Sequence, residues 1–158
     1  MKIGVISDTH GIIHPGAFTP LEGVNLILHA GDIGSEDVIS DLETIAPVMG
    51  VSGNTDTFPL AGRYKPVEFF EAQGKRIYLT HRFMEGEYKL PHVLKDIASR
   101  DPHIVVFGHT HMQYSDESSG RLLFNPGSAG HTRPGTRPGV GVLTIANSKV
   151  DHQIYYLD

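Results

Sequence analysis

The chain has 158 residues, with 13 Lys and Arg against 18 Asp and Glu, a formal charge of −5 and no cysteine. This composition excludes disulfides, thiolate zinc sites and cysteine nucleophiles, and it argues against bulk binding to nucleic acid. A chain of this length can bury an adequate core, so we expect one domain over residues 1–158. It starts on a strand pattern without a signal peptide, and no apolar stretch approaches the ~20 residues of a membrane span. We therefore expect a cytoplasmic protein with no membrane partner.

Short apolar runs, rich in Val, Ile and Leu, predict buried strands at 2–7, 25–30, 47–52, 76–80, 103–107 and 122–124. A helix is predicted over 35–46, with Ser35 as N-cap and Pro47 as its end. A second is predicted over 91–99 and a short one over 17–21. Strands alternate with helices in the first half, which predicts a largely parallel sheet.

The rest of the chain contains hairpin signals. Val67–Ala72 and Lys75–Thr80 flank a Gln-Gly turn, and 140–146 and 149–157 flank an Asn-Ser turn. These antiparallel pairs predict mixed sheets, in an α/β protein overall. Residues 127–139 are crowded with Gly, Pro, Thr and Arg and predict a long loop directly after a strand.

Each predicted strand of the parallel type ends in polar residues. In open α/β sheets, functional groups gather at the carboxyl ends of strands. Each of these polar residues also has a purely structural explanation when taken alone, since Asp and Asn commonly cap turns and helices. Together they predict a site with carboxylate, amide and imidazole ligands for two metal ions. The candidate ligands are Asp8, His10, Asp32, Asn54, His81, His109 and His111. Other histidines, at 14, 29, 92, 103 and 152, are expected to be structural or surface residues.

The ordered set Asp8-Thr9-His10, Gly31-Asp32, Gly53-Asn54-Thr55-Asp56, His81 and Gly108-His109-Thr110-His111 resembles the calcineurin-like metallophosphoesterases. The resemblance is to the small single-domain phosphodiesterases of bacteria and archaea, and it extends to Asn125-Pro126-Gly127-Ser128. It implies a four-layer αββα fold, in which two mixed sheets pack face to face with helices outside. The metal site would lie at the carboxyl ends of the strands.

The resemblance also implies which residues bind each ion. One ion would be bound by Asp8, His10, Asp32 and His111, and the other by Asp32, Asn54, His81 and His109, so that Asp32 bridges them. A hydroxide shared by two ions would then attack phosphorus. Asp32, Asn54 and His109 would act directly at the reacting centre. Manganese is the first choice of ion, with Fe, Co, Ni, Zn or Mg as alternatives.

The sequence departs from the family pattern in two places. Thr55 stands where many members have a catalytic histidine, and Arg82-Phe83 follows His81 where Gly-His is usual. His131 is the first candidate for the acid that protonates the leaving group, with an exposed loop histidine as the alternative. Arg82 and Arg133 are candidates for binding substrate phosphate, with solvated surface charges as the alternative.

The expected function is hydrolysis of small phosphodiesters. A phosphomonoesterase with the same metal core is a rival, and so is a non-catalytic scaffold of the same fold that binds other proteins. The expected partner is the small phosphoester substrate, with a homodimer as a further possibility that the resemblance implies.

Overall fold

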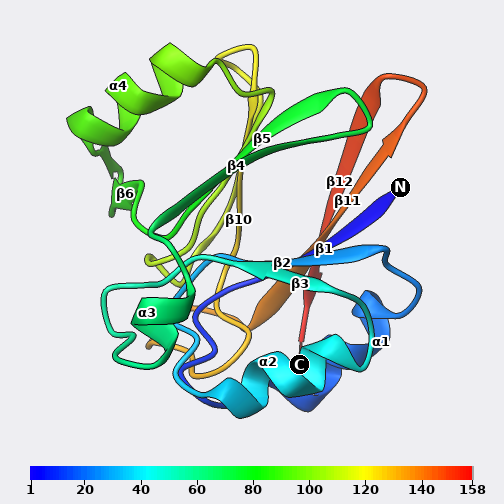
Figure 1. Cartoon of the computed structure of the whole chain (residues 1–158), viewed down its shortest axis with the longest axis vertical. Helices are drawn as coiled ribbons and strands as arrows, with labels where there is room; N and C mark the ends of the chain where they lie inside the picture. The colour runs from blue at the N-terminus through cyan, green and yellow to red at the C-terminus, as the bar shows by residue number, and fades with distance from the viewer. Residues whose placement is uncertain (158) are drawn as a thin grey trace.

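Two five-stranded mixed sheets form the centre of the computed structural model, which describes residues 1–157 (Figure 1). The first sheet has the order β12-β11-β1-β2-β3 and the second the order β4-β5-β8-β10-β9. The first contains β1 (Lys2–Ile6), β2 (Leu26–His29), β3 (Val48–Gly50), β11 (Gly139–Ala146) and β12 (Lys149–Tyr156). The second contains β4 (Val67–Ala72), β5 (Lys75–Thr80), β8 (Ile104–Val106), β9 (Gln113–Asp116) and β10 (Leu122–Pro126).

Each sheet contains three adjacent parallel strands, at one edge of the first sheet and in the centre of the second. In the first, β1 pairs in parallel with β2 and β2 with β3; in the second, β8 lies between β5 and β10 and is parallel to both. The hairpin strands flank them as antiparallel neighbours, as predicted. Because parallel strands point the same way, the residues that follow them emerge at a common edge.

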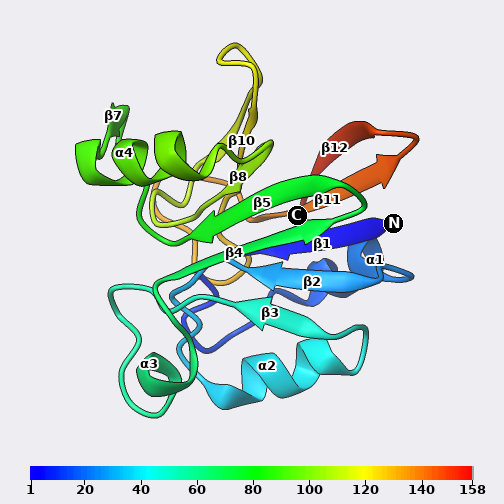
Figure 2. The ribbon, with the colours of Figure 1, turned by 45° about the horizontal axis from the view of Figure 1, so that its top comes forward.

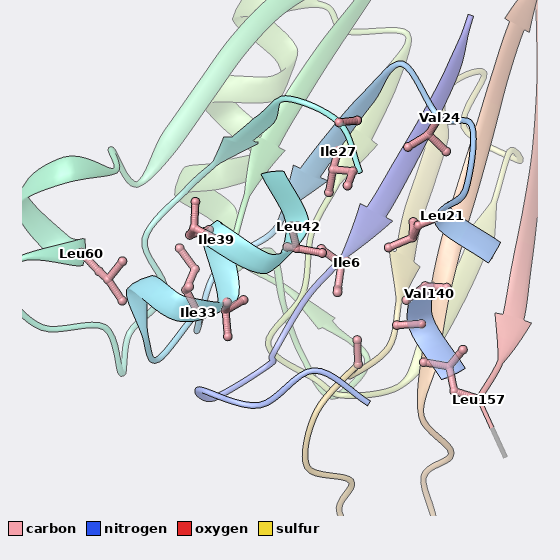
Figure 3. Close-up of a cluster of buried hydrophobic side chains, with 14 residues drawn as sticks. Ile6, Leu21, Val24, Ile27, Ile33, Ile39, Leu42, Leu60, Val140 and Leu157 are labelled. Carbon is pink, nitrogen blue, oxygen red and sulfur yellow. The ribbon is translucent and has the colours of Figure 1, made fainter. Parts of the chain in front are cut away.

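Side chains alternate between the two faces of each strand, and this divides the buried apolar side chains among three clusters, one between the sheets and one on the outer side of each sheet. On β8, Ile104 and Val106 face the core between the sheets, whereas Val105 faces the opposite side. On β2, Leu28 joins the core between the sheets and Ile27 joins the outer cluster shown in Figure 3. Successive side chains of a strand point to opposite faces, so a strand buried on both faces reads as a continuous apolar run.

Helices cover the outer faces of both sheets. A 3-10 turn at Pro15–Ala17 leads into α1 (Phe18–Leu21), and α1 and α2 (Glu36–Glu43) lie beneath the first sheet in Figure 1, whereas α4 (Pro91–Arg100) lies beside the second sheet. Figure 2 shows the short α3 (Leu60–Arg63) beyond the end of β3. The mixed, helix-flanked sheets confirm the predicted fold class. None of the helices within residues 1–157 combines the length and the apolar composition that a membrane crossing requires.

Several boundaries differ from the sequence prediction. Ser35 caps α2 as predicted, but the helix ends at Glu43, because the backbone N–H of Thr44 donates to the carbonyl of Asp41 three residues back and tightens the last turn. The strand expected at 47–52 is shortened to β3. The sequence analysis did not predict β9, α3 or the small hairpin of β6 (Met84–Glu85) and β7 (Tyr88–Lys89). These elements are short, and tertiary contacts rather than local patterns define them.

Candidate metal centre

Left-handed backbone turns direct the ligand side chains into one region. Asp8, His10, Asp32, His109 and His111 all have positive φ, between 48° and 73°. This conformation is uncommon for residues other than glycine and costs on the order of 1–3 kcal/mol at each position. Such strain persists where the surrounding structure imposes it, and it often marks functional sites.

Asp8, His10 and His111 form the first cluster. The Nε2 atom of His111 lies 3.3 Å from Oδ1 of Asp8 and 3.2 Å from Nε2 of His10. The same Oδ1 atom lies 4.0 Å from Nε2 of His10. One ligand atom from each residue lies within 4.8 Å of the others, so a single ion could contact all three.

Asp8, Asp32 and His81 form the second cluster. The Nε2 atom of His81 lies 3.2 Å from Oδ2 of Asp32 and 4.0 Å from Oδ1 of Asp8. The amide oxygen of Asn54 adjoins this cluster, 3.0 Å from Nε2 of His81 and 3.1 Å from Nδ1 of His109. The fold thus brings all seven predicted ligands together.

The two aspartates lie between the clusters. Oδ2 of Asp32 is 3.2 Å from His81 and 3.7 Å from Nε2 of His10, so it faces both groups of histidines. Oδ1 of Asp8 also faces both, at 3.3 Å from His111 and 4.0 Å from His81. The resemblance made Asp32 the bridging ligand; the geometry gives Asp8 a similar position.

The hydrogen bonds at this centre suit a bound cation. Nδ1 of His81 lies 2.7 Å from the carbonyl oxygen of Ala30, so it carries the proton, and a neutral ring then turns a lone pair at Nε2 toward the oxygens of Asp32 and Asn54. Oδ2 of Asp8 accepts two hydrogen bonds, but its buried Oδ1 accepts none. When the His81 ring is neutral, several lone pairs therefore converge without a donor between them. A metal ion would satisfy them, and these nitrogen and oxygen ligands suit a divalent transition metal.

The aspartates and histidines of the site shift each other's pKa values. Burial raises the pKa of Asp8 and Asp32, but the imidazoles of His111 and His81 outweigh that effect and hold both pKa values below their usual range. Burial lowers the pKa of His81, yet Asp32 and Asp8 together raise it above its ordinary value. The aspartates are therefore anionic at neutral pH, and the centre attracts cations.

The end of β10 and the residues after it support residues 108–111, the histidine loop, which carries His109 and His111. The buried amide of Asn125 donates to the carbonyl of Gly108 at 3.0 Å and to the hydroxyl of Thr110 at 3.1 Å. The Ser128 hydroxyl donates to the carbonyl of Asp8 at 2.8 Å. These residues are not candidate ligands themselves, but they orient the two loops that carry four of the candidate ligands, Asp8, His10, His109 and His111.

Asp56 orients the loop that carries Asn54. Its carboxylate accepts backbone N–H groups from Gly53 at 2.8 Å, Gly34 at 2.9 Å and Ile33 at 3.2 Å. The backbone of Thr55 donates to Oδ1 of Asp32 at 2.9 Å. Thr55 thus contributes a main-chain donor where many family members have a histidine side chain.

Sequence reasoning did not identify Glu85 as part of the site. Its Oε2 atom lies 2.9 Å from Nε2 of His109, and its Oε1 atom accepts from the guanidinium of Arg82. Arg82, a predicted phosphate-binding residue, is therefore already paired with a carboxylate. The only sequence signal was the spacing of three between Arg82 and Glu85, which is common on protein surfaces.

The other two substrate candidates lie in the loop after β10. His131 is exposed, and it is its carbonyl, not its ring, that accepts from Ser128. Arg133 is exposed, and its backbone makes a turn with Thr136. Within residues 1–157, neither side chain makes a hydrogen bond or ion pair with the seven candidate ligands. Their roles in acid catalysis and phosphate binding stay predictions.

A cleft of about 430 Å³ opens beside the metal centre. Asn54, His81 and Arg82 are among the residues that line it. The remaining wall comes from the start of β4, from β5 and from the first turns of α4. Two of the candidate ligands therefore face this cleft.

The two sheets and the histidine and aspartate clusters at their strand ends define a metallophosphoesterase type of centre. The family model described as the calcineurin-like phosphoesterase superfamily domain matches residues 1–148. The chain therefore belongs to this superfamily, a metal-binding phosphoesterase family, which confirms the resemblance drawn from the sequence.

Individual relatives agree with this assignment. A probable metallophosphoesterase of Methanothermobacter thermautotrophicus is 37% identical over 98% of this chain and 91% of its own length. The solved structure of a novel archaeal phosphodiesterase has a TM-score of 0.78 and 26% identity, covering 98% of this chain and 100% of its own. Vps29 of Chaetomium thermophilum has a TM-score of 0.85 at 19% identity, covering 100% and 86%, and shares the fold.

Proposed function

We propose that this protein is a metal-dependent phosphodiesterase that binds two divalent ions, with manganese as the first choice. Asp8, His10 and His111 would bind one ion, and Asn54, His81 and His109 the other, with the two aspartates between them. When bound, the ions would supply Lewis acidity, polarising the phosphoryl group and making water a better nucleophile at neutral pH.

One observation in particular supports this proposal. The Nδ1 proton of His81 is held by the Ala30 carbonyl, so the Nε2 lone pair meets Oδ2 of Asp32 at 3.2 Å and Oδ1 of Asn54 at 3.0 Å. Three electron-rich atoms at these distances require a cation among them, either a proton on the ring or a metal ion. A purely structural cluster would be expected to contain donors as well as acceptors.

The surrounding side chains support a diester substrate. The guanidinium of Arg82 is paired with Glu85, and the cleft also contains the carboxylate of Asp96, so the wall carries no excess of positive charge. A phosphodiester carries one negative charge, whereas a phosphomonoester carries nearly two and needs more cationic groups. The amide of Asn54 lies where the cleft meets the ligands and can donate to a phosphate oxygen.

The proposal is tested by counting metal ions and by paired assays. Metal-free protein is loaded with Mn²⁺, bound metal is measured by calorimetry, and hydrolysis of matched aryl phosphodiesters and phosphomonoesters is compared. We expect two ions and faster hydrolysis of the diester. Faster hydrolysis of the monoester would favour a phosphomonoesterase, and two bound ions without turnover of either ester would favour a binding scaffold.

A further inference from the structure

We propose that Glu85 is the positioning residue for His109, and that it determines which ring nitrogen of this histidine faces the metal centre. The inference rests on the proposed function, because it concerns the ion that His109 would bind. It begins from one contact: Oε2 of Glu85 lies 2.9 Å from Nε2 of His109, while Nδ1 of the same ring lies 3.1 Å from Oδ1 of Asn54.

The contact selects one tautomer of His109. A carboxylate can only accept hydrogen bonds, so the ring proton sits on Nε2 beside Glu85. The lone pair is then on Nδ1, on the side of Asn54 and the second cluster. A histidine that binds a metal commonly donates its other ring N–H to a carboxylate or carbonyl, which fixes the ring and increases its basicity. Glu85 meets this requirement for His109 as the carbonyl of Ala30 does for His81.

Apolar packing holds Glu85 at this position. Its neighbours Phe83 and Met84 are buried, and the ring of Phe83 lies 5.1 Å from that of Phe107 in an edge-on contact. Phe107 lies two residues before His109, just as Phe83 lies two residues before Glu85. The packing of the two rings therefore helps to place both Glu85 and His109. The backbone N–H of Leu90 donates to the carbonyl of Phe83 at 2.9 Å and closes the small hairpin that carries Glu85.

Arg82 completes the arrangement. Its guanidinium donates to Oε1 of Glu85, which leaves Oε2 for His109. One carboxylate thus joins a metal ligand to a residue on the wall of the substrate cleft. The segment from Arg82 to Glu85 begins where the sequence departs from the usual family pattern after His81.

The test compares two glutamates of the same hairpin. Glu85→Ala and Glu87→Ala remove the same charge, but Glu87 is exposed and has no contact with His109. In calorimetric titration with Zn²⁺, Glu85→Ala should lower the affinity for one of the two ions by 10–100-fold and leave the affinity for the other unchanged. Glu87→Ala should bind both ions as the wild type does. Glu85→Gln retains an acceptor oxygen and should recover part of the loss.

A spectroscopic measurement separates positioning from a general loss of structure. In the Zn²⁺-loaded wild type, the ring ¹⁵N shifts of His109 should report a metal-bound Nδ1 and a protonated Nε2. Glu85→Ala should lose this signature at His109 alone, with His81 unchanged. Equal Zn²⁺ affinity and unchanged shifts in Glu85→Ala would overturn the inference, whereas failure of the wild type itself to bind Zn²⁺ would instead count against the proposed function.

Discussion

Gly53 lies against Asp32 so closely that a Cβ atom on Gly53 would come within 2.1 Å of Oδ1 of the aspartate. That oxygen accepts the backbone N–H of Thr55 at 2.9 Å. The absence of a side chain at Gly53 therefore lets the Asn54 loop and the Asp32 loop meet, and this meeting places two candidate ligands side by side.

Gly53→Ala should displace Asp32 and break its bond with Thr55. We expect loss of metal binding and a fall of about 1–3 kcal/mol in the free energy of unfolding, the usual cost of forcing an extra group into a packed site. Calorimetric metal titration and urea unfolding measure the two effects. Gly62→Ala is the control, because a Cβ there would come no closer than 3.5 Å to Phe58. Normal metal binding by Gly53→Ala would contradict the tight contact.

Asp32→Ala should abolish binding of both ions, because Oδ2 of Asp32 faces His81 at 3.2 Å and His10 at 3.7 Å. His111→Ala should mainly lower the affinity for the ion that Asp8 and His10 also bind. The measurement is the stoichiometry of Mn²⁺ in calorimetry. Unchanged stoichiometry in Asp32→Ala would show that Asp8 alone is sufficient to join the two clusters.

Removal of metal should lower the thermal stability of the protein. Without a cation, the buried Oδ1 of Asp8 has no hydrogen-bond partner and the lone pairs of His81 and Asn54 oppose one another. Mn²⁺ at 100 times its dissociation constant should stabilise the fold by about 2.7 kcal/mol per site. Melting curves of chelator-treated protein, with and without added Mn²⁺, measure the difference. A melting temperature that does not depend on metal would contradict binding to the folded state.

The buried histidine His29 should make stability depend on pH. Its Nδ1 accepts from the N–H of Gly31 at 3.2 Å, so its Nε2 proton points to the hydroxyl of Thr9, which in turn donates to the carbonyl of Ile33. Burial lowers the pKa of His29 to about 4, against 6.5 for an ordinary histidine. As the pH falls below 6.5, the unfolded chain binds a proton that the folded chain does not. Stability should therefore fall by about 2 kcal/mol between pH 7 and pH 5.

The comparison with His29→Gln isolates this effect. His81 acts in the opposite direction, because its raised pKa contributes stability that is present at low pH and lost as the pH rises. Urea unfolding of metal-free wild type and variant should show the advantage of the wild type shrinking from pH 7 to pH 5. A constant difference between the two proteins over this range would refute the low pKa of His29.

Local patterns in the sequence determined most of the secondary structure and the types of ligand. Apolar runs such as 103–107 are strands because a strand buried on both faces needs apolar side chains at every position, and β8 is buried throughout. The Gln-Gly turn also followed local rules, since Gln73 and Gly74 both have positive φ, as a tight hairpin requires. Polar residues such as Asp8 and His109 were identifiable because they interrupt these runs at the strand ends.

Only the tertiary structure decided how those ligands are arranged and supported. Glu85 meets His109 across 24 residues, and His29 is fixed by Thr9 from the loop after β1. Nor does spacing along the chain reveal that Asp8 faces both histidine groups as Asp32 does. Contacts of this kind depend on how the two sheets pack, and that packing brings together side chains whose separation in sequence carries no local periodicity. The chemical types of the ligands are therefore a local property of the sequence, whereas their shared geometry is a property of the fold.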